Sequence, residues 1–162
     1  MSFLRFLMLL SLVAWIGGLM FFAFVLAPTV FAPGVLPNTH LAGNIVGRAL
    51  GKLHWIAIVC GLVYLVSSVF YSSVTQGSPR VFASRNLLIV MMLLLTMVSQ
   101  FGIIPRMDTL RAQVSDFSAV PADNPARVQF DALHVWSTRV ESLVLLLGLI
   151  VVYLTASVFS TS

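Results

Sequence analysis

Four long apolar stretches occupy most of this chain of 162 residues, and they constrain its fold more than any other feature. Each stretch is long enough to cross the hydrocarbon core of a bilayer, about 30 Å thick, as a helix of roughly 20 residues. Hydrophobic residues make up 59% of the chain and charged residues 9%, a composition that argues against a water-soluble fold. We therefore predict an all-α integral membrane protein folded as a four-helix bundle.

The predicted crossings alternate with polar segments inside a single domain, residues 1–162. The first apolar run is longer than the apolar region of a signal peptide, about 7 to 15 residues, so we interpret it as a retained crossing. Crossings are expected at about 3–26, 53–74, 82–104 and 132–158, with polar excursions at 27–52 and 105–131. Both excursions then fall on one side of the membrane, opposite both termini.

Residues that start and stop helices refine these boundaries. Proline removes a backbone donor and clashes with the preceding turn, so Pro28 is expected to end the first crossing and Pro105 to end or kink the third. Asn38 or the next residue caps a helix that continues into the second crossing, and the fourth helix is expected to begin near Ala126. Apolar residues at three- and four-residue spacing in 107–114 predict a short amphipathic helix at the membrane interface. Helical extensions are therefore expected on one face of the bundle.

The net charge of +4 indicates a membrane partner rather than a nucleic acid. Most of the basic residues lie at or near the ends of the apolar stretches, where Lys and Arg anchor in anionic headgroups and set orientation. We expect the lipid bilayer as the partner, no nucleic acid, and a multi-pass protein in a bacterial inner membrane. The basic residues slightly favour the side with the two excursions as cytoplasmic.

The chain shows signs of an internal duplication. Pro28 and Pro105 are 77 residues apart, and two Leu-His dipeptides, ending at His54 and His134, are 80 residues apart. Each unit would hold two crossings, so the copies would be parallel repeats related by an axis along the membrane normal. Chance agreement is the alternative. If the repeat holds, His54 and His134 lie at equal depth near the membrane surface and face each other near the axis.

Polar residues form a stripe on one face of the predicted fourth helix. At about 100° per residue they fall within a sector of roughly 80°. The members are Arg127, Asp131, His134, Thr138 and Glu141. Ionisable groups at membrane depth usually face a bundle interior or a cavity, which makes the stripe a functional candidate. The alternative is ordinary pairing along a helix end that stands in water. Glu141, the deepest, must find a partner or take up a proton.

Two histidines on separate helices raise the question of a cofactor. His54 and His134 are side chains of the kind that bind b-type haem or copper, and they are equally suited to a hydrogen bond between helices. The sequence lacks His-x-x-x-His and Cys-x-x-Cys patterns, and Cys60 is its only cysteine. We therefore expect no cofactor, and keep a haem- or copper-binding redox protein as the alternative.

Glycines recur at spacings that favour close helix packing. Gly43, Gly47 and Gly51 repeat every four residues, and Gly17 and Gly18 lie within the first crossing. Small residues at such spacing let helices approach closely, within one chain or between copies. These faces are consistent with a homo-oligomer or a larger membrane complex.

Several short segments resemble the transmembrane protein 205-like family of small four-helix membrane proteins with a domain of unknown function. The segments span most of the chain and are Trp15-Ile16-Gly17-Gly18, Phe21-Phe22, Ala27-Pro28 with Phe31, Ala42-Gly43 with Gly47, Pro105-Arg106-Met107 with Arg111, and Phe130 through Leu133-His134 to Ser137. The resemblance implies four crossings and no established catalytic activity, and the drug resistance linked to eukaryotic relatives points towards export. Copper-resistance proteins of the CopD type look somewhat similar, but this chain lacks a matching set of His and Met ligands.

The sequence thus predicts a non-enzymatic membrane protein. Phosphate-binding glycine loops, nucleophile elbows and His-Glu-x-x-His motifs are missing from it. We expect a transport-related component, or an accessory or scaffold protein. Four helices form a thin solute pathway, so transport would need two or more copies.

Overall fold

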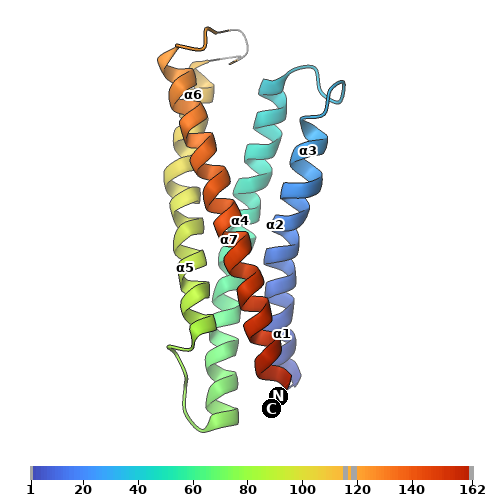
Figure 1. Cartoon of the computed structure of the whole chain (residues 1–162), viewed down its shortest axis with the longest axis vertical. Helices are drawn as coiled ribbons and strands as arrows, with labels where there is room; N and C mark the ends of the chain where they lie inside the picture. The colour runs from blue at the N-terminus through green and yellow to red at the C-terminus, as the bar shows by residue number, and fades with distance from the viewer. Residues whose placement is uncertain (1, 115–116, 118–119, 161–162) are drawn as a thin grey trace.

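The computed structural model describes residues 2–114, 117 and 120–160. Every regular element among these residues is helical, and four continuous helices are long and apolar enough to cross a membrane. The prediction of an all-α, four-helix membrane bundle is confirmed. Figure 1 shows the four helices running side by side, with the two chain ends together at one end of the bundle.

The first crossing is one continuous helix, Ser2–Val30, with two wider π-helical turns in it. Its parts are α1 (Ser2–Leu12), η1 (Val13–Gly17), α2 (Gly18–Phe21), η2 (Phe22–Leu26) and α3 (Ala27–Val30). The helix continues past Pro28, so the expected stop at this proline is wrong. Pro28 lies in the first turn of α3, where the missing backbone donor is tolerated, and η2 directly precedes it.

The third crossing has the same construction. It consists of α5 (Ser84–Val98), η3 (Ser99–Ile103) and α6 (Ile104–Gln113), which form one helix. Pro105 again lies in the first turn after a π-helical segment, so α6 extends the crossing and is not a separate helix lying on the membrane surface. Segments η2 and η3 are 77 residues apart, the offset that also separates the two prolines. This agreement supports the predicted repeat.

The second and fourth crossings are long unbroken helices. Helix α4 (Thr39–Gln76) begins where predicted, with the side chain of Asn38 accepting a hydrogen bond from the Leu41 amide at 2.8 Å. It ends at Gly77, whose positive φ of 69° requires the freedom of glycine. Helix α7 runs over Pro125–Ser160, one residue from its predicted start.

Packing is tightest at the end of the bundle that holds the termini. There α1 packs on α4, and α5 packs on both α4 and α7, around fully buried side chains that include Met8, Tyr71 and Val151. Buried hydrogen bonds add to the packing: Tyr64 pairs with Thr155 at 2.5 Å, and Arg85 donates to Ser68 at 3.0 Å. Towards the other end, α6 and α7 diverge from α3 and α4 (Figure 1).

Candidate functional site

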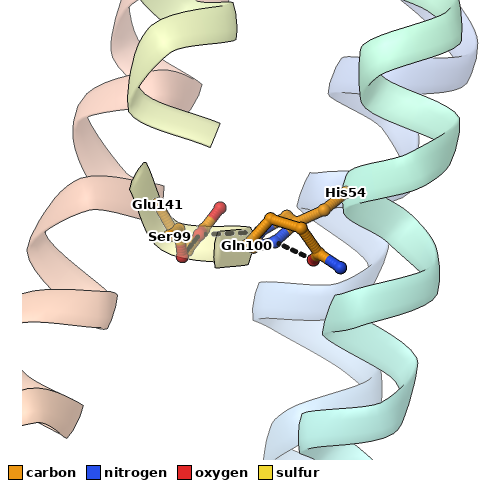
Figure 2. A network of polar contacts seen from close by, with 4 residues as sticks. All are labelled: His54, Ser99, Gln100 and Glu141. Atoms are coloured by element: carbon orange, nitrogen blue, oxygen red, sulfur yellow. Dashed lines mark hydrogen bonds and ion pairs between the residues drawn. The ribbon is translucent and has the colours of Figure 1, made fainter. Parts of the chain in front are cut away.

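A buried polar network links three helices inside the bundle (Figure 2). His54 of α4 contacts Glu141 of α7 through Nε2 and Oε1 at 2.9 Å, and its Nδ1 lies 3.0 Å from Oε1 of Gln100. The Ser99 hydroxyl donates to the same Glu141 oxygen at 3.0 Å. The His54 side chain is 2% exposed and that of Glu141 is 13% exposed, so the ionisable pair is largely removed from solvent.

Both ring nitrogens of His54 face oxygen atoms in this network. The amide oxygen of Gln100 faces one ring nitrogen, and a carboxyl oxygen of Glu141 faces the other. The contact between Nε2 and Oε1 needs one proton between these two atoms, and it forms with the proton on either of them. A proton that moves between Nε2 and Oε1 leaves the net charge of the pair unchanged. Chains of Asp, Glu and His side chains act as proton relays in membrane pumps and transporters.

The network lies near the middle of the first crossing. Gly18 is close to the centre of the Ser2–Val30 helix, and a Cβ added to it would be 2.8 Å from Leu53, the residue before His54. The expectation that His54 lies near the membrane surface is therefore wrong. That expectation placed the membrane surface at residue 53. In the structure, exposed apolar side chains of α1 to α3, such as Phe24, continue well beyond the level of His54.

Segment η3 brings two adjacent residues into the same network. In a regular α-helix neighbours point about 100° apart. Here Ser99 reaches α7 and Gln100 reaches α4, so the third crossing forms the bridge between the two ionisable residues. Single π-helical turns are frequent at functional sites. The sequence offered two signals for this network, the need of a deep Glu141 for a partner and the suitability of His54 for a hydrogen bond between helices.

A cavity of about 770 Å³ adjoins the network. It lies between α2 to α4 on one side and α6 and α7 on the other, and most of its lining is apolar. Glu141 is on its wall, so the carboxylate borders both the network and the cavity. Phe24 and Leu146 line the cavity and are also exposed on the outside of the bundle, so the cavity reaches the lipid-facing surface.

The structure divides the predicted polar stripe of α7. His134, Thr138 and Glu141 line the cavity. Above them, Asp131 is exposed and Arg127 donates to the backbone oxygen of Val120 at 2.7 Å. Among the described residues, the two upper ones do not form the pairs along the helix that the alternative expected, and the lower three form part of the cavity wall.

The two histidines singled out as ligands are not brought together. His134 is exposed and its ring stacks on Phe130, and it lies two turns along α7 from Glu141, a rise of about 10 Å. The expectation that His54 faces His134 is wrong, because Glu141 and Gln100 occupy both ring nitrogens of His54. Among the described residues, His, Cys, Asp and Glu side chains form no group of three or more that would hold a metal.

A family model for a domain of unknown function, DUF4149, matches residues 10–116, about two thirds of the chain. The chain belongs to this family. Searches of curated proteins and of solved structures find no match. The DUF4149 region includes His54, Ser99 and Gln100 and ends before α7, so Glu141 lies outside it.

Within the DUF4149 region, the predicted packing glycines receive side chains and not helix backbones. Gly18 faces Leu53, and Gly51 faces Gln100 at 3.9 Å. Gly43 and Gly47 form a cradle for the Arg111 side chain, a residue that was not predicted as part of a site. Gly17 faces open space within this chain, so its packing role inside the bundle is wrong.

Proposed function

We propose that this multi-pass membrane protein is a non-enzymatic, transport-related component whose cavity binds a small amphiphilic molecule from the bilayer. The observation that carries the proposal is the position of Glu141, on the wall of an otherwise mainly apolar cavity and hydrogen-bonded to His54. A cavity of about 770 Å³ is within the range of ligand pockets, about 300–1,000 Å³.

Each part of the site has a role in this proposal. The apolar lining holds the hydrocarbon part of the ligand, and the opening between Phe24 and Leu146 admits it from the lipid. The His54 and Glu141 pair gives a polar headgroup a place to lose or accept a proton near the middle of the membrane. A polar group there has no water to compensate it, so this exchange lowers the barrier to crossing.

The resemblance to transmembrane protein 205-like proteins supports a role in export, and we extend the proposal accordingly. The chain would act as two or more copies, or within a larger complex, in a bacterial inner membrane. It would hold no haem or copper, since His54 can ligate a metal only after losing one of its two hydrogen bonds. An absorption spectrum and elemental analysis of the purified protein test this part directly.

Binding is tested by photo-crosslinking in liposomes with a long-chain fatty alcohol that carries a diazirine. Cross-links should concentrate on cavity residues and fall several-fold in Ala23→Trp, which fills the cavity wall. Ala14→Trp is the matched control, because Ala14 is exposed on the same crossing outside the cavity. Cross-links spread evenly over the outer surface, and unchanged in Ala23→Trp, would refute the binding proposal.

Movement is tested by the rate at which a fatty acid, whose headgroup can exchange a proton with the pair, crosses the bilayer of the liposomes. Glu141→Gln removes the proton-exchanging carboxylate and should slow the movement to the rate of protein-free liposomes. Asp131→Asn is the matched control, since Asp131 is an exposed acid on the same helix. Equal rates for both variants and the unchanged protein would contradict a transport role for Glu141.

A further inference from the structure

The end of the cavity farthest from the His54 network is lined by side chains that carry hydrogen-bond donors. Arg111, His40 and His134 all line this part of the cavity. They come from α6, α4 and α7, so three separate helices direct nitrogen-bearing side chains to one region. Glu141, the acid on the cavity wall, is eleven residues from Phe130 along α7, about 16 Å away.

Arg111 is held in a fixed position across this end. Its guanidinium lies against Gly47, where an added Cβ would be 2.8 Å from Nη1, and its central carbon is 5.1 Å from the centre of the Phe130 ring. Nη1 donates to Asp108 at 2.8 Å. Among the described residues, Nε and Nη2 have no hydrogen-bond acceptor. The side chain is 11% exposed, whereas Asp108 is 59% exposed and largely hydrated, so the cation is only partly compensated.

His40 supplies a second donor of known orientation. The side-chain nitrogen of Asn44 lies 3.4 Å from its Nδ1 and can only donate, so Nδ1 accepts and Nε2 carries the proton. Nε2 is buried and has no hydrogen-bond partner among the described residues. A buried donor without an acceptor costs free energy, which a bound acceptor would recover. His40, Gly43 and Gly47 share one face of α4, so His40 lies on the same face of this helix as the Arg111 guanidinium.

We infer that the occupant of the cavity is a single-chain anionic lipid, with its charged headgroup at Arg111 and His40. An anion accepts from these donors and also completes the compensation of the cation, whereas a neutral acceptor would supply the hydrogen bonds alone. In this bound state the acyl chain extends along the apolar lining towards the His54 network, and the headgroup reaches that network only when the lipid moves further through the cavity. The available length of about 16 Å matches one leaflet of a hydrocarbon core about 30 Å thick. This inference rests on the proposed function and adds the chemical class of the ligand.

The position of the glycines agrees with this assignment. A side chain at Gly47 would displace the guanidinium from the wall of α4. The glycine repeat that the sequence suggested for helix packing therefore holds a cation at the end of the cavity farthest from the His54 network. Phe130 covers the other face of Arg111, which keeps water from one side of the headgroup site.

The test compares two photoactivatable probes of equal chain length in phosphatidylcholine liposomes, a fatty acid and its fatty alcohol. Labelling of cavity residues by the fatty acid should reach half-saturation at a concentration about tenfold lower than for the alcohol, as expected for a charged hydrogen bond. Arg111→Gln should abolish this preference. Arg106→Gln removes an exposed charge from the same helix and should keep it.

Arg111 also packs between helices, so a second variant separates binding from folding. His40→Phe keeps an aromatic ring and removes the Nε2 donor, and it should weaken fatty-acid labelling several-fold and reduce the preference for the acid over the alcohol. If acid and alcohol label the cavity equally and neither variant matters, the anionic headgroup is refuted while amphiphile binding stands. If neither probe labels the cavity, both the inference and the proposed function are refuted.

Discussion

Replacement of His54 by leucine is expected to destabilise the protein through the partner that remains. The substitution leaves Glu141, 13% exposed, without the donor that is 2.9 Å away. Breaking a buried ion pair by removing one partner costs about 3–5 kcal/mol. Glu141 keeps the Ser99 hydroxyl at 3.0 Å and borders a cavity, so we expect the low end, about 3 kcal/mol. The double variant His54→Leu/Glu141→Leu removes both charges and should return to within about 1 kcal/mol of the unchanged protein.

The assay is reversible unfolding in mixed micelles of increasing SDS content, followed by the helical circular dichroism signal. The two single variants and the double variant form a cycle with an expected coupling of at least about 2 kcal/mol, because His54→Leu alone should cost about 3 kcal/mol and the double variant at most about 1 kcal/mol. His54→Leu combined with Asp131→Leu is the control cycle and should be additive, since Asp131 is exposed and distant from the network. If the His54 and Glu141 effects simply add, the two side chains do not interact and the reasoning is refuted.

Two further substitutions test the packing and the hydrogen bonds of the closed end in the same unfolding assay. Gly61→Ala would place a Cβ 2.6 Å from Leu93 and 2.9 Å from Trp15, so it should lower the free energy of unfolding by about 1–3 kcal/mol. Gly17→Ala is the control and should cost nothing, because its Cβ meets nothing within 4 Å. Equal effects of the two substitutions would contradict the described packing. Tyr64→Phe removes the hydrogen bond to Thr155 and should lower the free energy of unfolding by about 1 kcal/mol. Tyr153→Phe is the control and should be neutral, because Tyr153 is 73% exposed. A similar loss of stability in both variants would refute the contribution of this hydrogen bond.

Features that depend on one helix were predictable from the sequence. Asn38 begins α4 because its side chain accepts from a backbone amide three residues later, a local rule that needs no tertiary information. The number of crossings follows from apolar length alone. The expectation that proline stops a helix came from the same kind of local rule. That rule does not consider the π-helical turns that precede both prolines and let both helices continue.

Features that depend on which helices meet were not predictable. Glu141 was placed on a polar face and expected to need a partner, but periodicity within α7 carries no information on the rotation of α4 opposite it. Whether His54 lies beside His134 depends on the tilt and depth of α4 and α7, and a single sequence does not contain this information. Arg111 was missed because its position depends on the Gly43 and Gly47 cradle of a different helix.

The η3 segment also controls the rotational phase of the third crossing. A π-helical turn holds one residue more than a regular turn, so the turn over Ser99–Ile103 takes up an additional residue without changing the phase of the helix beyond it. If the same residues formed a regular α-helix, everything beyond them would be rotated by about 100°. Arg111 would then turn away from Gly47, and the buried Met107 would turn away from its present partners. The two ends of the cavity are therefore aligned by the wider turn, and a change that makes this segment a regular helix would disrupt the site at both ends.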